Sequence, residues 1–351
     1  MVARNRLAEG VGLIAGVAAL AMGGLAAGLE LERRLVSKRI TRTPETQLAE
    51  FFALRSEGPT LTTADGVVLH TEIDEGPTGD VTVVWIHGYA LNLDNWHFQR
   101  RHFRGRVRQV FYDLRSHGRS SRSAPEHCRL DQLAVDLEQV LDEVAGPGPV
   151  VLIGHSMGGM TIMRLAASRP ELFGTRVVGV GLLHTSAGEL ADHSPIRGIP
   201  GRTFSRVAEP LMASLNRIPE LVQRTRRAGS DMGYVATRRL AFASDVPPSH
   251  VEYVSEMLAQ TPLEVVADFY PAFRDLDEYE ALAGLSKLPV LVVGGEDDLF
   301  TPVAHTERIT ERLPDAVALR LPHCGHLGMI EHPERVNEAL EDLLDRVRAA
   351  L

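Results

Sequence analysis

The segment Val150–Gly159 constrains the fold more than any other part of the chain. It reads V-V-L-I-G-H-S-M-G-G, an apolar run that leads directly into a glycine-rich turn. A run this rich in Val and Ile is typical of a strand that is buried on both faces. A helical stretch, Met157–Ser168, follows at once, so Ser156 stands at a strand-to-helix turn. Gly154 and Gly158 suit a sharp turn of this kind, because side chains there would clash.

The helix predicted to begin at Met157 gives this turn a second property. The first N–H groups of a helix have no acceptor within the helix and lie at the positive end of its dipole. The N–H of Met157 would therefore face the oxygen that becomes negative when Ser156 attacks a carbonyl carbon. The pattern predicts a serine nucleophile with an oxyanion donor beside it, and an ordinary tight turn is the alternative.

Short apolar runs alternate with helical patterns along the rest of the chain. The predicted strands are Val81–His87, Gln109–Asp113, Val150–His155, Val177–His184, Pro289–Gly294 and Val317–Leu321. Apolar residues spaced three and four apart predict helices over 130–144 and 333–347. Such alternation predicts a mostly parallel sheet with helices on both faces. The alternation stops over 187–285, where a helical pattern interrupted by prolines predicts a cap inserted between two strands.

The first 42 residues differ from the rest in charge and hydropathy. The chain of 351 residues has a net charge of −9, yet residues 1–42 hold seven Arg or Lys and three Glu. Residues 10–29 carry no charged or polar side chain. Twenty helical residues span about 30 Å, the thickness of a bilayer core. We therefore predict an N-terminal apolar helix that anchors the protein to a membrane. The domains are then an anchor over 1–42, a core over 43–186 and 286–351, and the cap.

The orientation of this anchor depends on the flanking charges. Basic residues are more frequent after residues 10–29 than before them, which favours a cytoplasmic position for the core. Cleavage of the segment as an export signal is one alternative, and a buried helix is another.

Composition excludes several other classes of protein. The acidic net charge argues against nucleic-acid binding. Cys128 and Cys324 are the only cysteines, too few for a disulfide framework or a four-cysteine zinc site. We expect Cys324 to be a small buried apolar residue, with a thiol near the site as the alternative, and a bridge between Cys128 and Cys324 stays open. The basic run His97–Arg108 is predicted to be a solvated face, and contact with anionic lipid is the alternative.

The motifs resemble those of one family. Gly154–Gly159 resembles the nucleophile elbow of α/β-hydrolase fold enzymes, especially monoglyceride-lipase-like and haloperoxidase-like esterases. Tyr112–Ser120 resembles the family's D-x-x-G-H-G-x-S stretch, with Ser116 where glycine is usual. The resemblance implies an α/β-hydrolase fold with a mostly parallel, eight-stranded sheet, flanking helices and a cap.

Two further stretches carry the resemblance into the site. His87 and Gly88 at the end of a predicted strand resemble the family's oxyanion loop, which makes Tyr89 the second oxyanion donor. The catalytic acid follows the serine in this fold, and Glu296, Asp297 and Asp298 compete for the role. The family pattern places the acid four residues before a proline, here Pro302, and so selects Asp298. Asp297 is the second choice and Glu296 the weakest.

A loop with three histidines follows the last predicted strand. Gly325-His326 followed by Glu331-His332-Pro333 resembles the family's catalytic-histidine loop, which makes His326 the base. His323 and His332 are predicted to be structural, and His155 to pack with its ring turned away from the pocket. Binding of a metal by His323, His326 and Asp298 is a weaker alternative, because the helix spacing of known zinc motifs is missing. No cofactor is expected.

Together these features predict a serine hydrolase that cleaves carboxylic esters through an acyl-enzyme. The cap would form a pocket for an apolar acyl chain of a small-molecule ester. A cofactor-free haloperoxidase, a carbon–carbon bond hydrolase and an acyltransferase use the same triad and stay open. A hydrolase-like binding protein without catalysis is the alternative outside enzymes. The oligomeric state is left open.

Overall fold

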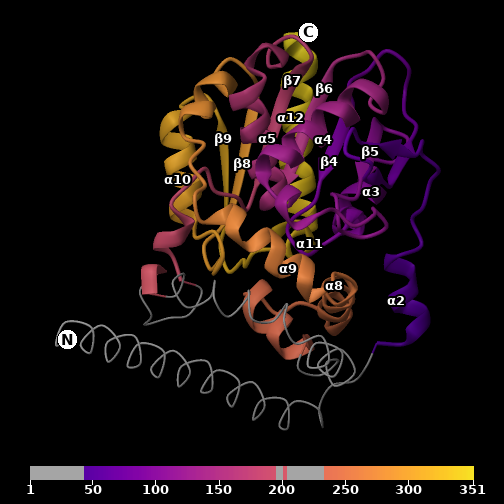
Figure 1. The fold of residues 1–351 in the computed structure, drawn as a ribbon, viewed down its shortest axis with the longest axis vertical. Helices are drawn as coiled ribbons and strands as arrows, with labels where there is room; N and C mark the ends of the chain where they lie inside the picture. Colours follow the sequence, from indigo (N-terminus) through magenta and orange to yellow (C-terminus); the bar gives the residue numbers. More distant parts are fainter. Residues whose placement is uncertain (1–42, 195–200, 204–232) are drawn as a thin grey trace, which may run out of the picture.

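The computed structural model describes residues 43–194, 201–203 and 233–351 (Figure 1). The predicted anchor over 1–42, including the apolar segment 10–29, lies outside the described residues. Within the described ranges, no helix is both long enough and apolar enough to cross a bilayer.

A mostly parallel sheet forms the centre of the described part of the chain. Its strand order is β3-β5-β4-β6-β7-β8-β9, and only β3 runs antiparallel to its neighbour. The strands are β3 (Thr71–Asp74), β4 (Thr82–Ile86), β5 (Arg108–Tyr112), β6 (Val150–His155), β7 (Val177–Leu183), β8 (Val290–Gly295) and β9 (Val317–Leu321). The six strands predicted from apolar runs are all present, each end within one residue of its predicted position.

The sheet has seven strands in the described ranges, and not the eight that were predicted. The two remaining strands, β1 (Leu61–Thr62) and β2 (Val68–Leu69), have two residues each and pair only with one another. β3 was not predicted, because its sequence T-E-I-D lacks the apolar character of a buried strand.

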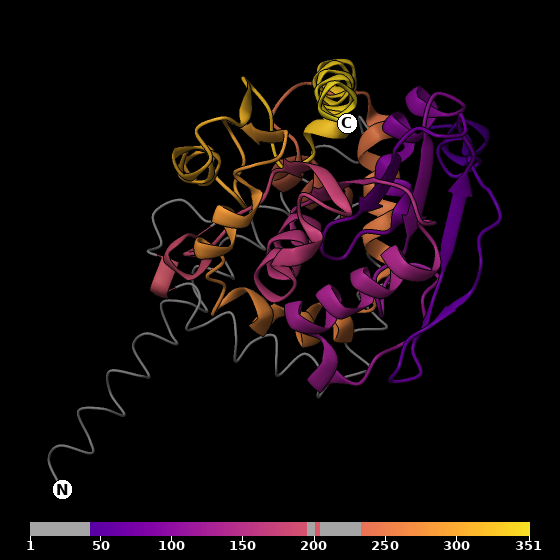
Figure 2. The same cartoon turned by 90° about the horizontal axis from the view of Figure 1, so that it is seen from above.

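Alternate residues of the strands point to opposite faces and enter separate cores. Val84 and Ile86 of β4 belong to one apolar cluster, and Val83 and Trp85 belong to the other. Figure 2 shows α4 and α5 on one side of the sheet and α12 on the other. The helices that cover the faces are α3 (His97–Phe103), α4 (Leu130–Glu143), α5 (Met157–Ser168), α10 (Val303–Arg312) and α12 (Pro333–Ala350).

The chain between β7 and β8 contains a helical cap, as the break in the strand pattern predicted. Its described helices are a segment over 233–241, α8 (Pro248–Gln260) and α9 (Leu263–Phe269). They lie at the end of the sheet where α11 (Gly328–Glu331) is found (Figure 1). The helix α2 (Glu45–Phe51) packs on α8, with the rings of Phe51 and Tyr253 stacked 4.7 Å apart. Residues 195–200 and 204–232 of the predicted cap lie outside the described ranges.

The basic run His97–Arg108 is a solvated face only in part: Arg101, Arg104 and Arg106 are exposed as predicted, but the prediction was wrong for His97 and Arg100. Arg100 is only 2% exposed, and His97 is buried as well. The Arg100 guanidinium donates to Glu72 at 2.6 Å and to Asp74 at 2.8 Å. Both acids lie on β3, so the local sequence around Arg100 holds no sign of them. The cysteine alternative is also settled, because Cys128 and Cys324 are buried and unpaired.

Candidate active site

Ser156 occupies the turn between β6 and α5 in a conformation that few serines adopt. Its φ is 51° and its ψ is −114°, so the backbone is in a positive-φ region. The two glycines of the motif make the turn possible. A Cβ on Gly154 would lie 2.5 Å from the carbonyl carbon of Gly158, and one on Gly158 would lie 2.2 Å from the Ile86 oxygen. Larger residues would therefore push the serine out of place.

Neighbouring strands hold this strained backbone in position. The N–H of Ser156 donates to the carbonyl oxygen of Leu183 at 2.9 Å. The Thr185 hydroxyl donates to the carbonyl oxygen of Ser156 at 2.7 Å. A positive φ at a residue with a side chain costs about 1–3 kcal/mol, and such strain persists only where the surroundings fix it. Ser156 is buried apart from a small part of its surface, 9%.

The predicted oxyanion loop lies directly against the serine. A Cβ on Gly88 would lie 3.3 Å from the Cβ of Ser156 and only 2.5 Å from Nδ1 of His155, so glycine lets the loop approach this closely. The ring of His87 fixes the loop through two hydrogen bonds. Its Nδ1–H donates to the Gly88 oxygen at 2.8 Å, and its Nε2 accepts from the Leu114 N–H at 3.0 Å. Burial, together with the neighbouring His117, lowers the pKa of His87 to about 3, so the ring is neutral. Of the two predicted oxyanion donors, Tyr89 follows Gly88 in this loop, and Met157 follows Ser156 as the first residue of α5.

The cap holds this loop from the other side. The Tyr89 hydroxyl donates to the carbonyl oxygen of Val266 in α9. The Thr261 hydroxyl, just before α9, donates to the Ala90 oxygen at 2.9 Å. Ala90 has a φ of 59°, an uncommon conformation for alanine, and this hydrogen bond helps to hold it. The loop therefore depends on the cap for its conformation, a connection that the sequence did not indicate.

Asp298 lies where an acid that serves His326 must lie. Its Oδ2 is 2.8 Å from Nδ1 of His326. Its Oδ1 accepts from the N–H groups of Phe300 and Thr301 at 2.8 and 3.0 Å, and the Thr301 hydroxyl donates to Oδ2 at 2.9 Å. Burial alone would raise the pKa of Asp298, but the rings of His326 and His184 outweigh it and hold the pKa well below its usual range. Asp297 and Glu296, the other two candidates, are exposed.

His326 is oriented by contacts at its ring and at its backbone. Because Nδ1 faces Asp298, Nε2 is the ring nitrogen on the side away from that carboxylate. The Ser156 hydroxyl is not hydrogen-bonded to His326 in the described part of the chain, and such bonds are often long before a substrate binds. The N–H of His326 donates to the Ala241 oxygen at 2.9 Å, so the cap also positions the histidine loop.

His155 and Glu331 have roles that the sequence interpretation missed. His155 is buried, as predicted, but its Nε2 bonds the carbonyl oxygen of His326 at 3.0 Å and the two rings lie 4.9 Å apart. Glu331 accepts from the N–H of Gly325 at 2.7 Å and from that of Ala243 at 2.9 Å, which joins the histidine loop to the cap. The only local signal for Glu331 was its place in the E-H-P stretch.

One group of side chains in the described ranges has the donors for a metal ion. Single ligand atoms of His184, Asp298 and His326 lie within 4.8 Å of one another. His323, which the sequence placed in the weaker metal alternative, is exposed and outside this group. Both rings are already hydrogen-bonded to the same carboxylate oxygen, at 3.3 and 2.8 Å. The two rings and the carboxylate are thus hydrogen-bonded to each other, and we assign no metal ion to them.

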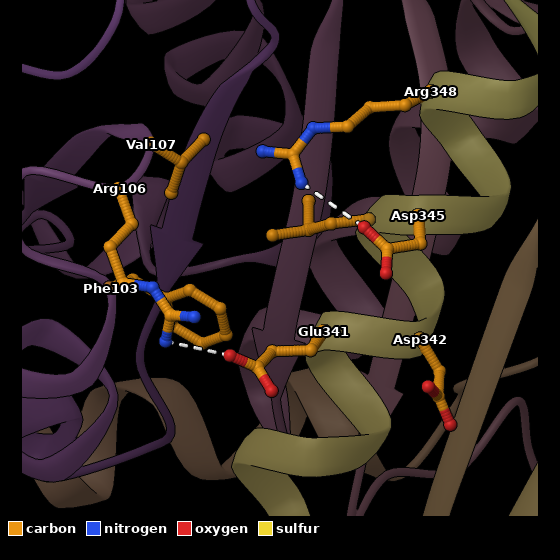
Figure 3. A pocket seen from close by; sticks show the side chains of 8 residues that line it. Phe103, Arg106, Val107, Glu341, Asp342, Asp345 and Arg348 are labelled. Atoms are coloured by element: carbon orange, nitrogen blue, oxygen red, sulfur yellow. Dashed lines mark hydrogen bonds and ion pairs between the residues drawn. The ribbon is translucent and has the colours of Figure 1, made fainter.

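A hollow of about 280 Å³ lies far from the serine, between α3 and α12 (Figure 3). Val107, one of its lining residues, precedes β5, whereas Ser156 follows the parallel strand β6. The hollow is therefore at the opposite end of the sheet. Four of its five charged groups form pairs, Arg106 with Glu341 at 2.7 Å and Arg348 with Asp345 at 3.3 Å. It has no part in the site described above.

Comparison with known proteins gives the family. The chain belongs to the alpha/beta hydrolase family, whose model matches residues 83–339. It is 28% identical over 313 residues to a dihydrolipoyllysine-residue acetyltransferase component of an acetoin cleaving system from Pseudomonas putida, covering 89% of this chain and 76% of that protein. It is 26% identical to the 3-oxoadipate enol-lactonase 2 of Acinetobacter baylyi, covering 75% of this chain and 88% of that protein.

The fold is also similar to solved structures. A thermophilic esterase from Thermogutta terrifontis matches with a TM-score of 0.64 and 24% identity, over 84% of this chain and 99% of that one. At 24% sequence identity, this similarity shows a shared fold and nothing more. The family, predicted from the motifs, and the mostly parallel sheet flanked by helices, predicted from the alternation of strand and helix patterns, are confirmed.

Proposed function

We propose that this protein is a serine hydrolase that cleaves carboxylic esters through an acyl-enzyme on Ser156. One observation carries the proposal. A strained serine elbow, with Gly88 packed against it, lies in the same cluster as a histidine bonded to a buried carboxylate. This is the set of groups that acyl transfer needs: a nucleophile, a base, an acid that orients the base, and N–H donors for the oxyanion.

In the proposed reaction, Ser156 Oγ forms a bond to the ester carbonyl carbon while Nε2 of His326 takes the hydroxyl proton. The N–H groups of Tyr89 and Met157 stabilise the oxyanion. The carbon–oxygen bond to the alcohol then breaks, and His326 gives its proton to the departing alcohol. Water repeats the sequence and releases the acid. Asp298 stays ionised throughout and stabilises the positive charge on the His326 ring.

The surroundings of His326 support an apolar substrate. Phe300 is 41% exposed, although it is a large apolar residue, and its ring lies 5.2 Å from the ring of His326. An exposed aromatic ring beside the base offers a surface for an apolar acyl or alcohol group. The esterase and enol-lactonase among the similar proteins act on ester bonds according to their names, which agrees with this substrate class.

Acyl transfer is the second candidate, because the acetyltransferase component from Pseudomonas putida matches 89% of the chain. The two reactions share the acyl-enzyme and differ only in the group that attacks it. Carbon–carbon bond hydrolysis and halide oxidation stay open for the same reason, and a binding protein without catalysis is the remaining alternative.

A fluorophosphonate probe tests the proposal, because it reacts with activated serines. We expect labelling of the wild-type protein and none of Ser156→Ala, with a matched loss of p-nitrophenyl ester hydrolysis. Labelling that persists in Ser156→Ala would remove Ser156 as the nucleophile. A folded wild-type protein that is neither labelled nor active would favour the binding protein. A series of p-nitrophenyl esters of increasing acyl length then defines the substrate, and activity on acetate alone would contradict an apolar acyl pocket.

We further propose that residues 10–29 attach the enzyme to a membrane, with the catalytic part on the cytoplasmic side. The support is the uncharged, twenty-residue stretch and the basic residues after it. Fractionation of cells that express the full chain tests this. Recovery of the intact chain in the soluble fraction would contradict attachment.

A further inference from the structure

His184 is a buried residue with an unusual backbone and a role that the mechanism above leaves unassigned. It follows β7, has a φ of 46° and is inaccessible to solvent. Its N–H donates to the Val293 oxygen at 2.7 Å, so its backbone is still tied to β8. A positive φ is uncommon for histidine and costs about 1–3 kcal/mol. The fold therefore holds this ring in place against a conformational preference.

The ring points at the proposed catalytic acid. Nδ1 of His184 lies 3.3 Å from Oδ2 of Asp298, the oxygen that also faces His326. Nε2 is buried and has no hydrogen-bond partner among the described residues. A Cβ on Gly328 would lie 2.3 Å from that nitrogen, so α11 closes this side of the ring. Because an ionised carboxylate only accepts hydrogen bonds, Nδ1 carries the proton and Nε2 is bare.

The charged and titratable groups around the ring favour this neutral tautomer. Burial lowers the pKa of His184, and His326 adds to the effect, while Asp298 and Glu331 oppose it without cancelling it. His155 faces the ring from β6, with the two ring centroids 6.3 Å apart, and it is buried with its own pKa well below the usual value. His184 thus presents a dipole to Asp298 and no net charge.

We propose that His184 is a positioning residue that holds Oδ2 of Asp298 against His326. The inference rests on the proposed function, because it assigns Asp298 and His326 to the triad. Oδ1 is fixed by two backbone N–H groups, while Oδ2 receives the Thr301 hydroxyl, the His326 ring and the His184 ring. Two neutral donors fix Oδ2 from beside His326. They leave the negative charge of the carboxylate for the imidazolium that forms during the reaction.

Two variants of nearly equal size separate this role from simple packing. In His184→Asn the side-chain amide nitrogen takes the place of Nδ1 and can still donate to Asp298. In His184→Leu a methyl group takes that place and cannot. We expect the Asn variant to keep kcat for p-nitrophenyl butyrate within about twofold, and the Leu variant to lose roughly tenfold, the effect of one hydrogen bond. KM should stay nearly constant in both.

The pH dependence of kcat/KM distinguishes the two roles, because a residue that only packs would leave it unchanged. With one donor removed, Oδ2 holds more charge and favours the protonated His326 ring. The acidic limb of kcat/KM should therefore move to higher pH in His184→Leu and stay in place in His184→Asn. The ring-proton resonances of His326, followed by NMR against pH, should shift in the same way without any substrate.

The two proposals fail in different ways. If the wild-type protein does not react with the fluorophosphonate, the triad itself is wrong. If the wild-type protein reacts, but His184→Leu and His184→Asn share one kcat and one His326 titration, His184 only fills space and the inference is overturned. Equal loss of kcat in both variants, with an unmoved acidic limb and a lowered melting temperature, also overturns it.

Discussion

Asp298 and Asp74 are both buried aspartates, but their partners differ in charge. Asp74 lies on β3, and its two oxygens accept from Nε and Nη2 of Arg100 at 2.9 and 2.8 Å. Asp298 accepts from two N–H groups, a hydroxyl and two histidine rings. A guanidinium always carries a positive charge, whereas a histidine gains one only when it takes a proton. The charge of Asp74 is therefore neutralised permanently, and that of Asp298 is not.

The difference explains which buried carboxylate can take part in chemistry. Among the described residues, no arginine or lysine is hydrogen-bonded to Asp298, so its charge would be available to an imidazolium on His326 in the proposed reaction. Glu72 and Asp74 share Arg100, and Glu72 also has Arg119 at 2.9 Å and Arg55 at 4.0 Å, so permanently charged arginines already balance these two carboxylates. The acids on β3 serve the fold, and we infer that Asp298 serves the reaction.

The largest effect is expected at Asp298. In Asp298→Asn the carboxylate charge is lost and the amide can impose the wrong tautomer on His326, so kcat should fall by about 10³–10⁴-fold. The matched control is Asp297→Asn, because Asp297 is exposed and adjacent in sequence. We expect that variant to keep its activity within about twofold. Hydrolysis of p-nitrophenyl butyrate by both purified proteins is the measurement. Loss of activity in Asp297→Asn, with Asp298→Asn unaffected, would reverse the assignment.

The next largest effect is expected on stability, at the other carboxylate cluster. Arg100→Met leaves Glu72 and Asp74 buried without their main positive partner, which should lower the free energy of unfolding by about 3–5 kcal/mol. The folded fraction should keep its kcat, because the cluster does not touch the reacting groups. Urea denaturation at pH 7.5 measures the loss.

Arg104→Met is the control for this change. Arg104 also lies near Asp74, at 3.9 Å, but its side chain is 48% exposed. An exposed pair contributes about 0–1 kcal/mol, so the control should lose little stability. Equal losses in the two variants would show that burial of Arg100 does not set the strength of its ion pairs.

The two clusters also differ in how far the sequence could predict them. Six strands and the strand-turn-helix segment around Ser156 were predicted correctly, because each depends on a short stretch of neighbouring residues, whereas β3 was missed. The Asp298–His326 bond was predicted through the family pattern. The contacts of Arg100 with β3 were missed and its exposure was predicted wrongly, because its partners lie 26 and 28 residues away.

The same physical reason explains what was missed around the site. His184 follows one strand and Asp298 follows the next, and only the assembled sheet brings them together across 114 residues. No periodic pattern marks a single polar residue at a strand end as a partner for another. The hydrogen bond between Thr261 and Ala90 was missed for the same reason, because it joins residues that are 171 apart in the sequence. Local sequence specifies elements, while contacts between strand ends depend on topology.

The smallest expected effect is a change of stability with pH, because buried histidines can gain a charge in acid whereas arginines are always charged. Burial lowers the pKa of His117 to about 4 and that of His87 to about 3, against an unfolded value of about 6.5. Below pH 6.5 these histidines are protonated in the unfolded chain but stay neutral in the folded chain. Falling pH therefore favours unfolding until the folded-state pKa is reached. Glu72, whose pKa is lowered from 4.5 to about 2, keeps its full contribution to stability above pH 4.5 and loses it as the pH falls from there toward 2.

Carboxyl groups with raised pKa values act in the opposite direction. Burial raises the pKa of Asp113 to about 6 and that of Glu278 to about 7, so these two take up protons in the folded state and partly offset the histidines. Asp94, Asp136 and Glu256 also have raised pKa values. Among the described residues, the seven histidines with lowered pKa values still outnumber these five carboxyls: His87, His97, His117, His155, His184, His250 and His305. The free energy of unfolding should therefore decrease between pH 6.5 and 4.5.

A single variant isolates one of these protons. In His117→Asn the amide can keep the bond to the Arg115 oxygen, which is 2.9 Å from Nδ1, but it cannot be protonated. The slope of the unfolding free energy against pH should then decrease by up to about 1.4 kcal/mol per pH unit between pH 6 and 4.5. His323→Asn at an exposed position controls for the substitution itself, and its slope should match the wild type. An unchanged slope in His117→Asn would mean that the folded protein protonates this ring freely. Burial would then not keep the ring neutral, and the contrast between uncharged histidine partners and permanently charged arginine partners would lose its physical basis.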